Sequence, residues 1–72
     1  MTTKYLLAKM YYNELKYFQG FFANEIYLTD NSTGALRFDS RAEADNMYSR
    51  LKYREPDDNW FIVSENITKE NY

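Results

Sequence analysis

The chain has 72 residues, of which 44% are hydrophobic and 19% aromatic, with 11 acidic and 9 basic residues and neither histidine nor cysteine. A chain of this length forms one domain, and its apolar content is ample for a packed core. The composition excludes disulfide scaffolds, thiolate metal sites and nearly all zinc sites, and a net charge of −2 provides no general attraction to nucleic acid.

The first half of the chain predicts three strands. Residues 4–12 (KYLLAKMYY) are rich in tyrosine and leucine, and Asn13 and Glu14 interrupt them as a turn would. Residues 15–22 form a second aromatic run with Gly20 inside it, a placement that predicts a β-bulge or a close backbone approach. Ala23 and Asn24 make a short turn before a third strand over residues 25–30.

Residues 14–20, ELKYFQG, read like the cleavage sequence of the viral cysteine protease used to remove affinity tags. A scar of that kind lies at a terminus beside a tag, whereas this segment lies within the second strand and has a hairpin partner before it. We therefore interpret it as native strand, which folding protects from cleavage except through local opening.

A helix is the clearest local signal. Residues 31–34 break the strand pattern, and residues 35–38 are expected to form a helical turn or a short extended link. Ser40 and Glu43 form a capping box that starts the helix, and Pro56 ends it at or before Glu55. Its apolar stripe comprises Ala44, Met47, Tyr48 and Leu51.

Residues 60–65 (WFIVSE) form the last strand, and residues 66–72 are expected to be a polar tail that frays. The order β-β-β-α-β predicts an α+β fold over residues 1–65: one antiparallel sheet of three to four strands with one helix packed on one face. The return strand is expected to lie beside the first strand.

Both faces of this sheet are predicted to be apolar. Along the first strand, Leu6, Ala8 and Met10 alternate with side chains that point the other way, such as Leu7 and Tyr11. A single helix of about 14 residues, about 21 Å long, covers one side of such a sheet. The other side is therefore expected to be exposed, self-associated, or covered by residues 35–38 and the tail.

The chain resembles a layout common in small uncharacterised phage and prophage proteins of Gram-positive bacteria. The resemblance rests on YLL near the N-terminus, YFxG in the second strand and ALRFDSRAEA at residues 35–44, followed by an apolar return strand. It covers residues 5–65. It implies a small accessory protein that binds and modulates a host enzyme or defence complex, and it carries no catalytic residues to this chain.

Candidate chemistry is sparse. Without histidine or cysteine, the common nucleophile–base pairs are excluded, and Asp57 with Asp58 is typical of a helix-to-strand turn rather than of a metal site. We expect no enzymatic activity, no cofactor and no metal. The N-terminal residues lack the apolar core of a signal peptide, and no run is long enough to span a membrane, so a cytoplasmic location is expected.

The favoured function is a protein-binding module that docks through the uncovered sheet face. Its candidate contacts are Tyr5, Tyr11, Tyr17 and Trp60, because tyrosine and tryptophan are enriched at interface hot spots. The partner is an unidentified host or phage protein, and these aromatics would equally suit the core or the seam of a homodimer.

Two alternatives remain open. In the first, single-stranded nucleic acid stacks its bases on the sheet aromatics while Lys4, Lys9 and Lys16 hold phosphates. The acidic balance and the absence of a recognisable RNA-binding motif count against it. In the second, acidic side chains mimic DNA. They are Glu55, Asp57, Asp58 and Glu65.

Overall fold

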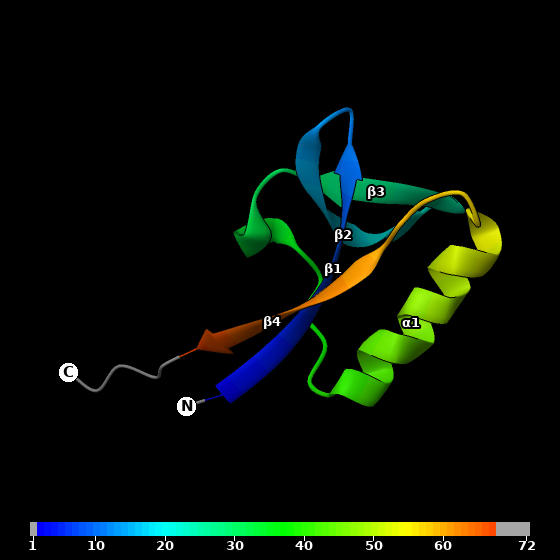
Figure 1. The fold of residues 1–72 in the computed structure, drawn as a ribbon. Helices are drawn as coiled ribbons and strands as arrows, with labels where there is room; N and C mark the ends of the chain where they lie inside the picture. Colours follow the sequence, from blue (N-terminus) through cyan, green and yellow to red (C-terminus); the bar gives the residue numbers. More distant parts are fainter. Residues whose placement is uncertain (1, 68–72) are drawn as a thin grey trace.

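The structure, a computed structural model, describes residues 2–67 (Figure 1). The elements are β1 (Thr2–Tyr11), β2 (Glu14–Phe22), β3 (Glu25–Thr29), the 3-10 turn η1 (Ser32–Gly34), α1 (Arg41–Arg54) and β4 (Phe61–Ile67). They form one antiparallel sheet in the order β3-β2-β1-β4 with a single helix beside it. The predicted α+β class is confirmed, and so is the place of the return strand beside the first.

Two tight hairpins connect the first three strands. Tyr12 and Asn13 have φ values of 51° and 66°, and Ala23 and Asn24 have values of 52° and 65°. Left-handed backbone at both central residues is what a two-residue type I′ turn requires, and this turn matches the natural twist of the strands. The second turn was predicted. The first begins one residue earlier than expected, because Tyr12 belongs to the turn and not to the strand.

The predicted bulge at Gly20 is confirmed. The pairing of β2 with β3 shifts between Phe18 and Gly20, and Gly20 has a φ of 149°, which L side chains rarely adopt. The bulge places Phe21, and not Phe22, against the core beside Phe18, whose ring centroid lies 5.3 Å away. Phe18 and Phe21 therefore both face the helix although they are three residues apart.

Helix α1 begins at the predicted cap. Ser40 Oγ accepts a hydrogen bond from the Glu43 amide at 3.2 Å, and the Glu43 carboxylate accepts one from the Asp39 amide at 3.2 Å. The reciprocal bond therefore reaches one residue further back than a capping box needs. Ala44 and Leu51 on the predicted stripe are fully buried against the sheet.

The core lies between α1 and one face of the sheet. Its centre is the buried cluster of Leu7, Phe18, Leu51 and Trp60. Trp60 precedes β4, and its ring meets Phe18 edge to face with centroids 6.1 Å apart. Half-buried side chains complete the core. They are Phe21, Ile26, Leu28, Phe38, Met47, Tyr48 and Ile62.

Residues 35–38 form an extended link, one of the two conformations predicted for them; the other was a helical turn. The Tyr5 amide donates to the Phe38 carbonyl at 3.0 Å and the Phe38 amide donates to the Tyr5 carbonyl at 2.8 Å, while the Leu36 amide donates to the Phe18 carbonyl. The link thus borders β1 over the stretch where β2 no longer pairs with it, since the β1–β2 register begins at Ala8.

Strand β4 is longer than predicted. Asn66 and Ile67, assigned to the polar tail, pair with Thr3 and Thr2 of β1. The long first strand provides the backbone groups that extend the ladder, so a polar sequence at this point does not end the strand. The rest of the expected tail, residues 68–72, lies outside the described residues.

Candidate protein-interaction surface

The sheet face opposite the helix carries exposed apolar side chains. Met10 of β1 pairs with Leu15 of β2, and Ala8 pairs with both Tyr17 and Phe61, so side chains from three strands share this face. Met10, Leu15 and Phe61 are 57%, 39% and 41% exposed, whereas Ala8 is fully buried beneath them. We call Met10, Leu15, Tyr17 and Phe61 the far-face patch.

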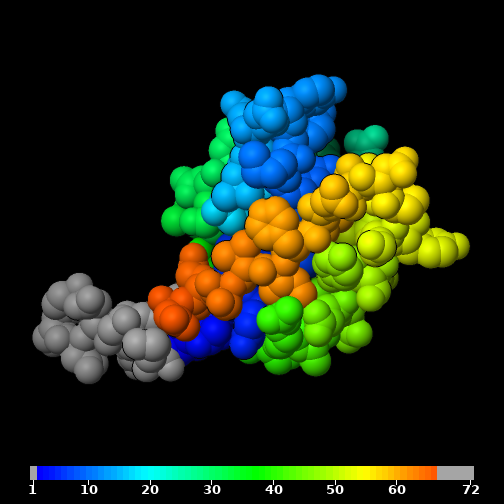
Figure 2. Space-filling view, viewed as in Figure 1, coloured from blue at the N-terminus to red at the C-terminus, as the bar shows by residue number. Residues whose placement is uncertain are grey.

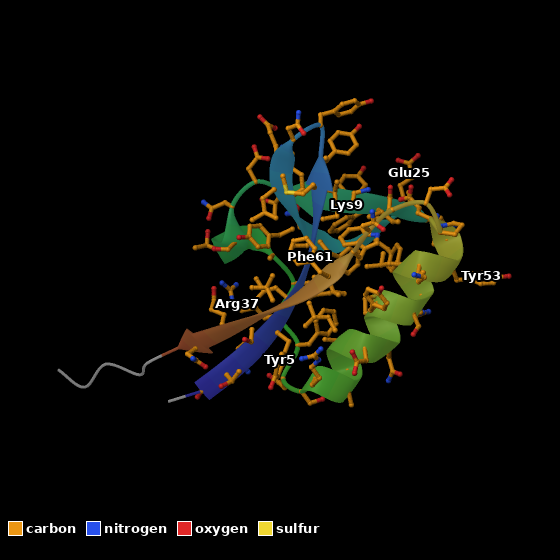
Figure 3. All side chains as sticks on the ribbon, viewed as in Figure 1. Tyr5, Lys9, Glu25, Arg37, Tyr53 and Phe61 are labelled. Atoms are coloured by element: carbon orange, nitrogen blue, oxygen red, sulfur yellow. The ribbon has the colours of Figure 1, made fainter. Side chains whose placement is uncertain are left out.

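Figure 3 labels Phe61 near the centre of the view, on β4. In Figures 2 and 3 the β1–β2 hairpin rises above this strand. Tyr17 is half-buried in the same row as Phe61. The side of the sheet that the helix leaves uncovered is therefore partly packed, at Leu6 and Ala8, and partly open.

The tip of the β1–β2 hairpin carries a further exposed aromatic ring. Tyr12 is 85% exposed, and its ring meets that of Tyr11 edge to face with centroids 4.5 Å apart. Tyr12 also has left-handed backbone, which a bulky side chain rarely adopts. The hairpin tip therefore exposes a large aromatic ring to water. Asparagine or glycine at this turn position would make the fold more stable.

The four residues predicted as contacts do not share one surface. Tyr17 belongs to the far-face patch, whereas Tyr5 and Tyr11 alternate with Ala8 and Met10 and point to the helix side. Tyr5 is half-buried and Tyr11 is exposed at the hairpin tip.

The prediction of Trp60 as a contact is corrected by the structure. Trp60 is 4% exposed within the core cluster, and its Nε1 has no acceptor among residues 2–67. Its neighbour Phe61 takes the outward position. Alternation along residues 60–63 shows that these two rings oppose each other, but only the pairing with β1 decides which one faces α1.

The lysines expected to hold phosphates are engaged by carboxylates. Lys4 forms an ion pair with Asp39, and Lys16 forms one with Asp30 and another with Glu14 at 3.2 Å. Hydrogen bonds to the Asp30 and Glu14 carboxylates raise the pKa of the Lys16 ammonium above its ordinary value. These two cations are therefore neutralised where a nucleic acid would need them.

Lys9 is engaged as well. It is 6% exposed, and its Nζ lies 2.6 Å from Asp58 Oδ2. This ion pair neutralises Asp58, one of the four acidic residues expected to mimic DNA. Arg37 neutralises a second, Glu65, at 2.9 Å. The positions of these charged side chains thus favour neither nucleic-acid binding nor DNA mimicry.

Other ligand-binding features are few over residues 2–67. This part of the chain holds no group of three or more acidic residues placed to bind a metal ion. None of its helices has the length and apolar character needed to cross a membrane.

A hollow of about 610 Å³ lies between the end of α1 and the β2–β3 hairpin, lined by Phe21, Asn24, Ser49, Arg50, Tyr53 and Arg54. Arg54 stacks on Phe21 and donates a hydrogen bond to the Asn24 carbonyl. One of the two cations that line the hollow is therefore already engaged within the fold.

Comparisons with known proteins supply no family for this small α+β chain. No protein-family model, no curated protein and no solved structure matches it.

Proposed function

We propose that the chain is a small non-enzymatic protein-binding module that docks through the far-face patch and the ring of Tyr12. Apolar side chains from three strands meet on one face, and together they expose on the order of a few hundred Å². A buried floor at Leu6 and Ala8 holds them in place. Rigid aromatic anchors on a packed floor are typical of interface hot spots.

Tyr12 is the observation that carries this proposal. A tyrosine in left-handed conformation costs about 1 kcal/mol relative to asparagine or glycine, and its 85% exposed ring gains little from the fold. Ala23 has the same left-handed backbone at the other hairpin, so what distinguishes Tyr12 is its large exposed aromatic ring, a kind of side chain enriched at interface hot spots. A partner that covers the ring would supply the missing stabilisation.

The resemblance to small phage and prophage proteins indicates the kind of partner. We infer that the module is an accessory protein whose surface binds a host protein, and that its effect comes from occupying that protein. The absence of histidine and cysteine from the whole sequence supports binding over catalysis.

The test is affinity capture from a lysate of the host, with matched variants. Tyr12→Asn and Phe61→Thr remove contacts of the proposed surface, and both should lose the captured partner. Ala23→Asn makes the equivalent change at the other type I′ turn, and Tyr53→Asn removes a tyrosine that is 90% exposed on α1. Both controls should keep the partner.

Circular dichroism and urea unfolding establish that all four variants fold. We expect Tyr12→Asn and Ala23→Asn to stabilise the fold alike, by about 0.5–1 kcal/mol, because asparagine suits both turns. Retention of the partner by Tyr12→Asn and Phe61→Thr would refute the proposed surface. Salt-sensitive binding of a labelled single-stranded oligonucleotide would favour nucleic acid instead.

A further inference from the structure

The cationic side chains that lack a carboxylate partner lie together at the end of α1. Within residues 2–67, ion pairs engage the other cationic side chains, namely Lys4, Lys9, Lys16, Arg37 and Arg41. The cations that this part of the chain leaves without an ion pair are Arg50, Lys52 and Arg54, all in the last two turns of the helix. A chain of net charge −2 therefore concentrates its free positive charge at one place.

Two of these cations line the hollow of about 610 Å³ between the end of α1 and the β2–β3 hairpin. The end of the helix lies beside the start of β3 (Figure 1). Residues four apart on a helix share one side, which brings two such pairs to this hollow. They are Ser49 with Tyr53 and Arg50 with Arg54.

Arg54 forms a fixed wall of the hollow. Its guanidinium lies 5.4 Å from the centroid of the Phe21 ring and donates a hydrogen bond to the Asn24 carbonyl. A guanidinium carries five N–H groups, so further donors remain. Arg50 lies one turn earlier, is exposed, and forms no ion pair within residues 2–67. The two guanidinium groups therefore leave N–H donors for an anion in the hollow.

The groups that line the hollow favour a phosphate. No carboxylate is among the lining residues, and the Ser49 hydroxyl adds one more donor. The planar fork of a guanidinium matches two oxygens of a phosphate, and a doubly charged anion gains from a second cation nearby. Glu25 and Glu55 directly follow lining residues, and the carbonyl end of α1 is partly negative. These groups oppose an anion, so the binding is expected to be weak.

The hollow is larger than a phosphate alone needs. Its volume of about 610 Å³ lies within the range of roughly 300–1,000 Å³ that is usual for small-molecule sites. Tyr53 is 90% exposed and projects from the helix at the rim (Figure 3), where its ring is free to stack on a base. Asn24 adds a side-chain amide, which suits the N6 and N7 edge of adenine. These groups fit a nucleobase beside the phosphate.

We propose that this hollow binds a nucleoside monophosphate, with the phosphate on Arg50 and Arg54 and the base against Tyr53. An open site with carboxylates nearby predicts a dissociation constant on the order of 0.1–1 mM at low salt. None of the lining residues belongs to the far-face patch, and Tyr12 lies at the other hairpin. The site is therefore independent of the proposed function.

An NMR titration of the ¹⁵N-labelled chain tests the proposal with three probes: AMP, inorganic phosphate and adenosine. AMP should shift the amide signals of residues 21–24 and 49–54. Phosphate and adenosine each supply half of the contacts, so each should bind about tenfold more weakly than AMP at the same residues. Phosphate that binds as tightly as AMP would make the hollow an anion site without a base, which overturns the proposal.

Three variants locate the two halves of the ligand. Arg50→Gln should weaken AMP by about tenfold, because it removes the free guanidinium. Lys52→Gln is the matched control, since Lys52 is also unpaired within residues 2–67 but lies 5.9 Å from the Tyr48 ring and does not line the hollow. It should change the affinity by less than about twofold. Tyr53→Leu should weaken AMP at least about threefold and leave inorganic phosphate unchanged.

All three side chains are exposed, so the variants should fold, and circular dichroism verifies it. AMP at about 10 mM that shifts none of the amides of residues 21–24 and 49–54 overturns the proposal. An equal loss in Arg50→Gln and Lys52→Gln also overturns it, because it would show general attraction of charge. A short oligoadenylate that binds these residues at least about tenfold more tightly than AMP would assign the hollow to single-stranded nucleic acid instead.

Discussion

Lys9 and Asp58 join the middle of the sheet to the loop between α1 and β4. The Lys9 ammonium lies 2.6 Å from Asp58 Oδ2 and 5.1 Å from the centroid of the Trp60 ring. Lys9 is 6% exposed, so this cation depends on one carboxylate and on aromatic faces for its stabilisation. This ion pair fixes the loop that precedes Trp60 and thereby positions the Trp60 ring in the core.

Removing only the carboxylate should be costly. In Asp58→Asn the buried ammonium loses its counter-charge, and we expect the free energy of unfolding in urea to fall by about 1–3 kcal/mol. Lys9→Met removes the charge and keeps an apolar chain of similar length, so its loss should stay within about 1 kcal/mol. A larger loss for Lys9→Met than for Asp58→Asn would contradict the expectation that an unpaired buried ammonium is the main cost.

Gly20 is required by its backbone and not by lack of space. A Cβ at this position would meet the Phe22 ring at an ordinary 3.6 Å, but a φ of 149° is strained for any L side chain. We expect Gly20→Ala to lower the free energy of unfolding by about 1–3 kcal/mol. Ala23→Gly, at a φ of 52°, should instead stabilise by up to about 1 kcal/mol. Equal effects of the two substitutions would contradict this account.

The segment ELKYFQG should resist its protease in the folded protein. Residues 14–20 lie in β2, whose residues 14–17 pair with β1 and whose residues 17–22 pair with β3, so cleavage requires opening of the sheet. Mass spectrometry should show intact protein under conditions that cut a free peptide of residues 10–24.

The rate of that cleavage should follow stability. If cutting proceeds through the unfolded population, a variant destabilised by about 1.4 kcal/mol is cut about tenfold faster. Gly20 belongs to the recognition segment itself, so Asp58→Asn is the better variant for this comparison. Cleavage of wild type as fast as the free peptide would show that β2 is not held in the sheet.

The Lys16 ion pairs predict a stability loss at alkaline pH. Its pKa in the folded state is raised above the ordinary 10.5 by the Asp30 and Glu14 carboxylates. A group with a raised folded pKa stabilises the fold fully below its unfolded pKa, and this contribution is lost as pH rises through the folded value. Lys16→Met should therefore differ from wild type by a constant amount near neutral pH, and the difference should shrink above pH 10.5.

The comparison with the variant isolates Lys16, because every other ionisable group is common to both proteins and cancels in the difference in unfolding free energy. A difference that stays constant above pH 10.5 would mean that Lys16 gains nothing from its carboxylates.

Local interactions were enough to predict much of the fold. The helix start at Ser40 depends on a cap made within four residues. The turn at Ala23–Asn24 and the bulge at Gly20 depend on positive φ values that Asn24 and Gly20 accept. The prediction failed at Asn66 and Ile67, because a polar stretch stays in the sheet when a long partner strand provides backbone groups for it.

The candidate surface was less predictable from the sequence. Alternation shows that Trp60 and Phe61 point to opposite faces, but the helix covers only one face, and only the pairing of β4 with β1 decides which ring it covers. The lysines looked free because the aspartates that bind them lie 14 to 49 residues away, and only Glu14, the second partner of Lys16, is close in the sequence. Local sequence specifies which elements form, since caps, turns and bulges act over a few residues. Which side chains remain exposed depends on the packing of distant segments, because burial requires contacts between them.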